Sequence, residues 1–164
     1  MNYWLMKSEP SVFSIDDLKS CPKSTDHWDG VRNFQARNMM RDRMKTGDIV
    51  FFYHSNCLVP GISGIMEVVR EGYPDPTAFD PESLYFDAKS DVSNPRWFMV
   101  DVRYVRHTKR LIPLSELKSH PALVAMPLVR KGNRLSIMPI SVSEWEVILS
   151  LESITSKVHN LTPN

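Results

Sequence analysis

The alternation of apolar and polar positions predicts a chain of short strands. IVFFY is a continuous apolar run of strand length, which indicates a strand covered on both faces. From Phe98 onward every second residue is apolar, which is typical of a strand with one face inward. Pro139 indicates an edge position for the last strand. We expect strands at residues 3–7, 49–53, 61–69, 98–104 and 134–140.

A helix is predicted between Asn33 and Gly47. Ala36, Met40 and Met44 recur every four residues as a buried stripe, and Gly47 is the expected stop. A second stripe at the same spacing carries Asn33, Arg37 and Arg41. The helix therefore combines one apolar face with one polar, cationic face.

Three further helices are expected to be short. Ser14 and Asp17 have the spacing of a capping box, and so do Ser143 and Glu146 at the start of the last helix. A short helix is expected at residues 114–118, between two prolines. Residues 72–95 are rich in Pro, Asp and Ser and are interpreted as a long acidic loop.

These elements indicate an α+β domain built on a mainly antiparallel, barrel-like sheet with short helices, because no βαβ rhythm is present. The chain has 164 residues, which fits one domain. We expect this domain at residues 1–152 and a C-terminal tail at residues 153–164.

Composition excludes several classes of protein. No apolar run approaches the roughly 20 residues that span a bilayer, and the first residues lack the features of a secretory signal, so we expect a cytoplasmic protein without a membrane partner. The two cysteines and five histidines form no metal-binding motif, so neither a metal nor another cofactor is expected. The net charge is +1, yet residues 30–47 and 96–110 are basic and residues 71–91 are acidic. One face of the molecule is expected to be locally basic.

The four tryptophans divide into two pairs. Trp4 lies in a strand and Trp145 on an apolar helix face, which indicates core packing. Trp28 and Trp97 each lie beside turn residues, where a side chain can face a ligand. Aromatic rings combined with amide and hydroxyl groups suit a nucleobase, since stacking holds its face and polar groups read its edge.

Two other functions remain open on the residues alone. An enzyme acting on a nucleotide could use Ser8 or Cys57 as the nucleophile, with His54 as the base and Glu9 beside it. No GxSxG elbow and no cysteine-enzyme signature supports that alternative. A protein-interaction domain could instead use the acidic loop.

Several motifs in order resemble one family. They are KSEP after YWL, W-x-GVRNxQARN, GDxxFFYHS, GIxG, PRW with VDVR, and RLSxMPxS with EW. Together they are similar to the EVE domain family, a PUA-like family related to the YTH and ASCH domains, over roughly residues 1–152. The resemblance implies a PUA-like pseudo-barrel with a pocket for a modified base.

The resemblance and the helix pattern together assign the candidate site residues. The implied function is a non-catalytic module that binds a modified cytosine in DNA or a modified nucleoside in RNA, with no catalytic residue and no cofactor. Residues expected in the base pocket are Lys7, Ser8, Glu9, Trp28, Asn33, Tyr53, His54, Ser55, Trp97 and Ser136. Residues expected to bind phosphates are Arg32, Arg37, Arg41 and Arg134, with Arg103, Arg106 and Arg110 as the next candidates.

Overall fold

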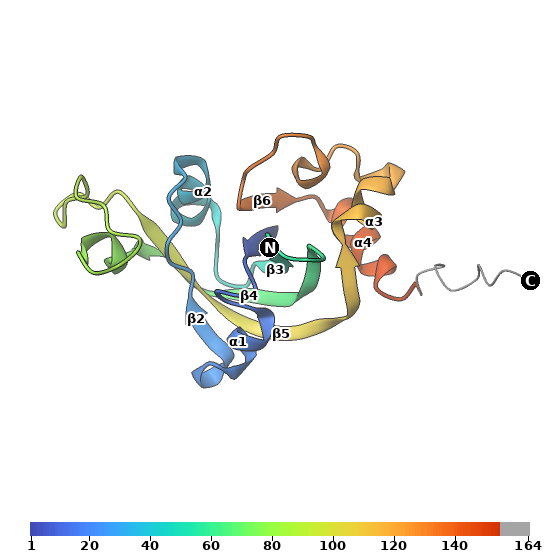
Figure 1. The fold of residues 1–164 in the computed structure, drawn as a ribbon, viewed down its shortest axis with the longest axis horizontal. Helices are drawn as coiled ribbons and strands as arrows, with labels where there is room; N and C mark the ends of the chain where they lie inside the picture. Colours follow the sequence, from blue (N-terminus) through green and yellow to red (C-terminus); the bar gives the residue numbers. More distant parts are fainter. Residues whose placement is uncertain (155–164) are drawn as a thin grey trace, which may run out of the picture.

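The protein is built on one six-stranded sheet that curves without closing (Figure 1). A computed structural model describes residues 1–154, and most of the expected tail at residues 153–164 lies outside that range. The strand order is β2-β5-β4-β3-β1-β6. The strands are β1 (Tyr3–Ser8), β2 (Thr25–His27), β3 (Ile49–His54), β4 (Gly61–Pro74), β5 (Phe98–Pro113) and β6 (Ile137–Ile140).

Short helices flank this sheet, and all of the described helices fall short of the length and apolarity needed to cross a membrane. The α-helices are α1 (Ile15–Ser20), α2 (Phe34–Asn38), α3 (Leu114–Ser119) and α4 (Val142–Leu151). A π-helix, η2 (Met39–Arg43), continues α2. The 3-10 helices are η1 (Pro22–Ser24), η3 (Pro76–Phe79), η4 (Pro121–Leu123) and η5 (Pro127–Val129).

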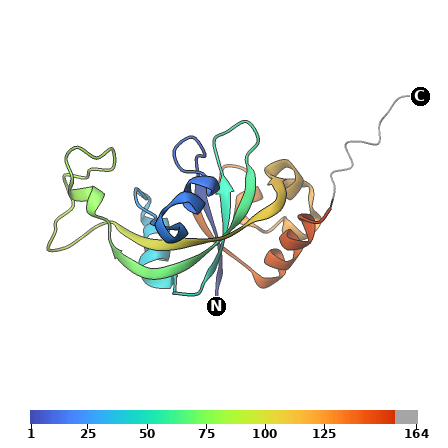
Figure 2. The same cartoon turned by 90° about the horizontal axis from the view of Figure 1, so that it is seen from below.

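The strand pairing confirms a mainly antiparallel sheet with one exception. β1 runs parallel to β3, with Tyr3 opposite Ile49, and every other pair in the sheet is antiparallel. β4 and β5 form a long curved ribbon (Figure 2). The segment between them, residues 75–97, lies at one end of this ribbon, and α3 and α4 lie at the other.

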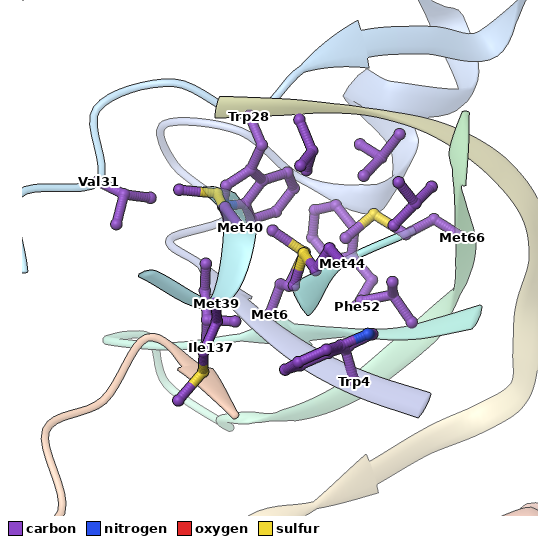
Figure 3. Packing of buried hydrophobic residues seen from close by; sticks show 14 of the residues in the cluster. Trp4, Met6, Trp28, Val31, Met39, Met40, Met44, Phe52, Met66 and Ile137 are labelled. Atoms are coloured by element: carbon purple, nitrogen blue, oxygen red, sulfur yellow. The ribbon is translucent and has the colours of Figure 1, made fainter. Parts of the chain in front are cut away.

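Two cores lie on opposite faces of the sheet, as the uninterrupted apolar run of β3 predicts. Phe52 packs in the first core with Trp4, Met6 and Trp28, and α1, α2 and η2 cover that face (Figure 3). Phe51 points the other way, into the second core, where its ring stacks on that of Trp145 at 3.8 Å between centroids. Successive residues of a strand face opposite sides, so one apolar run supplies both cores.

Several predicted boundaries were wrong. β4 and β5 run to Pro74 and Pro113, beyond the predicted ends at residues 69 and 104. The helix from Asn33 ends at Arg43 and not at Gly47, because the Met44 amide bonds the Met39 carbonyl and closes a π-turn. The last strand begins at Ile137, three residues after the predicted start. The last helix is capped by Ser141 with Glu144 and not by Ser143 with Glu146.

Candidate nucleic-acid interface

A cavity of about 540 Å³ opens where the end of β1, the segment after β2 and the 75–97 segment meet. This volume lies in the range of small-molecule pockets. The end of β1 and the turns that follow β1 and β2 supply most of its wall. The lining residues are Lys7, Ser8, Glu9, Val12, Phe13, Asp26, His27, Trp28, Asp29, Gly30, Val31, Arg32, Tyr85 and Ser136.

Trp28 forms an aromatic wall that belongs to the core as well as to the cavity. Its backbone amide donates a hydrogen bond to the Val100 carbonyl at 2.8 Å, which fixes the segment after β2 against β5. Its ring meets Phe13 and Phe52 edge to face, at 6.3 Å and 5.4 Å between centroids. The wall is therefore held by packing before any ligand arrives.

Tyr85 contributes a second aromatic ring to the cavity. It lies in the segment at residues 75–97, called the acidic segment below. Gly30 has a φ of +77°, and a Cβ built at this position would lie 2.7 Å from the Tyr85 ring. Only glycine adopts this backbone conformation freely and also leaves room for the ring. The close approach therefore sets where the acidic segment meets the turn after β2.

Arg32 holds this arrangement together from inside. Its Nε and Nη2 both donate to the Tyr85 carbonyl, at 3.0 Å and 2.7 Å, and Nη1 donates to Asp75 Oδ2 at 3.0 Å. Its Nη2 also donates to the Thr77 hydroxyl at 3.1 Å. The guanidinium thus has a protein partner on each of its nitrogens.

Asp75 is fully buried and is the acceptor at the centre of this network. Burial alone would raise its pKa, but hydrogen bonds from Thr77, from the Gly30 amide and from Arg32 together hold the pKa below its usual range. The carboxylate therefore stays ionised in the folded protein. It ties the turn at Gly30 to η3.

Polar groups line the rest of the cavity. Burial lowers the pKa of Lys7, whose Nζ lies 5.8 Å from the centre of the Tyr53 ring. The Lys7 amide donates to the Ser136 carbonyl at 2.8 Å, which brings the residues before β6 to the cavity. Burial is the largest influence on Asp29 and raises its pKa, with repulsion from Asp75 in the same direction. The cavity thus presents both donors and acceptors between aromatic walls.

Six of the fourteen predicted site residues line this cavity, and the others lie elsewhere. The six are Lys7, Ser8, Glu9, Trp28, Arg32 and Ser136. Asn33 lies outside, and its side chain caps α2 by accepting a hydrogen bond from the Ala36 amide at 3.0 Å. Tyr53 packs in the second core, and the Ser55 amide bonds the Ser8 carbonyl at 2.9 Å.

Trp97 also lies outside the cavity, which differs from the expectation that its ring faces a ligand. Its side chain is buried, with 6% of the residue exposed. The ring stacks on Phe34 at 4.8 Å between centroids, and its Nε1 donates to Asp87 at 2.7 Å. Trp97 therefore anchors the acidic segment to the start of α2.

The residues proposed for an enzyme are not assembled as a nucleophile and base. His54 Nε2 accepts a hydrogen bond from the Ile15 amide at 3.2 Å, and burial lowers the pKa of the ring. The Ser8 hydroxyl donates to the Phe13 carbonyl at 2.6 Å. Within residues 1–154, no hydrogen bond joins His54 to Ser8 or Cys57, and no cluster of acidic, histidine or cysteine side chains is placed to hold a metal.

The predicted phosphate-binding arginines differ in their surroundings. Arg37 donates to the Arg96 carbonyl at 2.8 Å and lies 4.7 Å from the centre of the Phe34 ring. Arg41 is paired with the neighbouring Asp42 at 2.8 Å. Arg134 is exposed, two residues before Ser136, and has no ion pair with any residue in the described part of the chain.

Eight lining residues were not predicted: Val12, Phe13, Asp26, His27, Asp29, Gly30, Val31 and Tyr85. The Asp29-Gly30 turn signal beside Trp28 could have indicated the first wall, because turn residues often carry sites. The Tyr85 wall had no comparable signal. Its place follows from contacts with residues more than fifty positions earlier.

Comparison with known proteins gives a consistent family assignment. The model of the EVE domain matches residues 2–151. Human thymocyte nuclear protein 1 is 50% identical over 92% of this chain and 74% of that protein. A crystal structure of a Pseudomonas putida protein is 51% identical, with a TM-score of 0.88 over 92% of this chain and 99% of that one.

Two further structures bear on the site and the fold. A crystal structure of human THYN1 protein in complex with 5-methylcytosine-containing DNA is 48% identical, with a TM-score of 0.90 over 95% of this chain and 100% of that one. An ASCH protein from Zymomonas mobilis shares the fold alone, at 12% identity and a TM-score of 0.56 over 92% of this chain and 99% of that one. The described fold, a PUA-like mixed sheet with short helices, agrees with both. The chain belongs to the EVE domain family.

Proposed function

We propose that the protein is a non-catalytic DNA-binding domain that takes a modified cytosine, with 5-methylcytosine as the first candidate, into the cavity beside Trp28. The observation that carries the proposal is the human THYN1 protein in complex with 5-methylcytosine-containing DNA, since the two chains share their fold and about half of their residues. RNA with a modified nucleoside is the second candidate ligand. The arrangement of the cavity supports a base as the occupant.

The aromatic and polar lining residues suit the ring face and the polar edge of a cytosine. Trp28 and Tyr85 present rings to a flat ligand, and base–aromatic stacking contributes about 1–3 kcal/mol per base. The edge of cytosine carries an amino donor, which a carboxylate such as Asp29 can accept, and Lys7 can donate to a carbonyl oxygen. A 5-methyl group adds apolar surface, which the side chains of Val12 and Phe13 can cover.

The proposal is tested by binding of the wild-type protein to matched oligonucleotides. Four strands with one target position, carrying cytosine, 5-methylcytosine, N4-methylcytosine or thymine, are titrated as DNA duplexes, as single-stranded DNA and as RNA. We expect the tightest binding for DNA with 5-methylcytosine. Equal affinity for the four bases in duplex DNA, single-stranded DNA and RNA would reject the proposal. A preference seen in RNA alone would show that the ligand is RNA and not DNA.

Replacing Tyr85 by alanine should weaken binding of the modified strand by about 1–3 kcal/mol, because the base loses one stacking partner. The variant loses the contact of the ring with Gly30 but retains the carbonyl that Arg32 binds, so the main-chain hydrogen bonds that hold this turn remain. Phe86→Ala is the matched control, since Phe86 is the next aromatic residue and lies outside the cavity lining. Equal losses in the two variants, measured by titration calorimetry, would count against a ligand-facing Tyr85.

Arg134→Gln should reduce the salt dependence of binding to modified and unmodified DNA alike. The slope of log affinity against log salt should fall by roughly 0.9 for one lost contact with a duplex phosphate. Arg103→Gln is the control, because Arg103 is paired with Glu67 on the sheet. A slope that falls for Arg41→Gln and stays unchanged for Arg134→Gln would place the phosphate backbone along η2 instead.

A further inference from the structure

Leu84 occupies an unusual place beside the cavity. The amide of Phe86 donates to the Ser83 carbonyl at 3.2 Å, so Leu84 and Tyr85 are the central residues of one tight turn. Tyr85 lines the cavity, whereas 97% of Leu84 is exposed. One residue of this turn therefore lines the cavity, and the residue before it is open to solvent.

The turn that carries Leu84 is fixed on both sides. Arg32 makes two hydrogen bonds to the Tyr85 carbonyl, and the Tyr85 amide donates to the Ser83 hydroxyl at 3.1 Å. The Tyr85 ring rests against Gly30. Single exposed apolar side chains are common and carry no inference by themselves. Here the exposed side chain stands on a braced turn, next in sequence to a wall of the cavity.

We propose that Leu84 inserts into the base stack of duplex DNA at the place left by the cytosine that enters the cavity. This inference rests on the proposed function, because no gap exists unless a base has left the stack. Turning a base out of a duplex costs a few kcal/mol. Proteins insert apolar side chains between base steps, and in a gap such a side chain covers the faces of the two flanking bases.

The adjacency of the two residues fits this task. A base that leaves the stack stays attached to its own sugar and phosphates, so the base in the cavity and the gap in the stack belong to one nucleotide. Tyr85 lines the cavity and Leu84 precedes it in the same turn, so the pair can contact both parts of that nucleotide. Val12 is also an exposed aliphatic residue, but it lines the cavity and would contact the base itself.

The experiment compares one variant on two forms of the same DNA. Leu84→Ala is titrated against a duplex with a single 5-methylcytosine and against the same strand without its complement, which has no paired stack to fill. We expect roughly a tenfold loss on the duplex, the ratio that about 1.4 kcal/mol gives, and no loss on the single strand. Leu84→Phe should retain duplex binding. Leu58→Ala, at an equally exposed leucine between β3 and β4, is the matched control and should change neither affinity.

A second readout follows the DNA directly. The adenine analogue 2-aminopurine, placed next to the 5-methylcytosine, gains fluorescence when its neighbour leaves the stack. We expect a gain with wild-type protein and a smaller gain with saturating Leu84→Ala.

The following results would contradict the proposal that Leu84 enters the base stack. Equal losses on duplex and single strand would make Leu84 an ordinary surface contact, and no loss on either would remove it from the interface. A duplex-specific loss in Val12→Ala alone would place the wedge on the opposite rim. Failure of the proposed function is visible separately, as wild-type protein that does not distinguish 5-methylcytosine from cytosine, and the inference then falls with it.

Discussion

Replacing Arg32 by methionine lowers the free energy of unfolding by about 3–5 kcal/mol, the usual cost of leaving one charge of a buried pair alone. Asp75 is fully buried, and Arg32 is its cationic partner at 3.0 Å. Methionine keeps much of the side-chain length and removes the charge and the hydrogen bonds. Urea unfolding of the two proteins, followed by tryptophan fluorescence, gives the difference.

A double variant distinguishes the cost of the unpaired buried charge from the cost of the other hydrogen bonds that Arg32 makes. Asp75→Asn combined with Arg32→Met removes both charges, so it should recover part of the stability lost by Arg32→Met alone. An Arg32→Met protein of unchanged stability that loses salt-dependent DNA binding would contradict this expectation. It would return Arg32 to the phosphate-binding role that the sequence predicts.

Trp97→Ala should lower the free energy of unfolding by a similar amount, about 3–5 kcal/mol, as truncation of a buried tryptophan does. The residue is 6% exposed, stacks on Phe34 and donates its indole N–H to Asp87. The loss should appear in thermal unfolding of the free protein, with no ligand present.

Trp97→Phe is the control for this prediction. It retains a ring against Phe34 and loses the hydrogen bond to Asp87, so its stability should lie between those of the wild type and Trp97→Ala. A Trp97→Ala protein with wild-type stability and weakened base binding would show that the ring meets the ligand after all.

The sequence predicted five of the six strands, because their patterns are local. β3 carries apolar residues on both faces, so Phe51 and Phe52 reach opposite cores. β2 is three residues long, carries no such pattern and was not predicted. The capping box of Ser14 and Asp17 was likewise readable, because both partners lie within one turn.

The boundaries failed where distant pairing decides between two local choices. Ser141 with Glu144 and Ser143 with Glu146 have the same spacing, so the sequence offers two capping boxes. β6 pairs with β1 as far as Ile140, opposite Tyr3, and the helix begins directly after it. Pairing with β1, more than a hundred residues away, therefore decides which of the two boxes caps the helix.

The site was only partly predictable for a related reason. An arginine that binds phosphate and one that braces a buried carboxylate look alike in a sequence, and Arg32 is the second kind in this structure. Tyr85 lies in a segment with few regular elements, whose position depends on Arg32 and Gly30. Trp97 lies beside turn residues, as predicted, yet its ring points inward.

The position of β1 sets the order in which the chain can complete its sheet. β1 is made first, yet its two neighbours are β3 and β6, and β6 ends at Ile140. During synthesis one edge of β1 thus stays without its partner until almost the whole domain has left the ribosome. Pairings this distant in sequence form slowly, and an open strand edge favours association with other chains. A ribosome that stalls before residue 137 would therefore release a chain prone to aggregation.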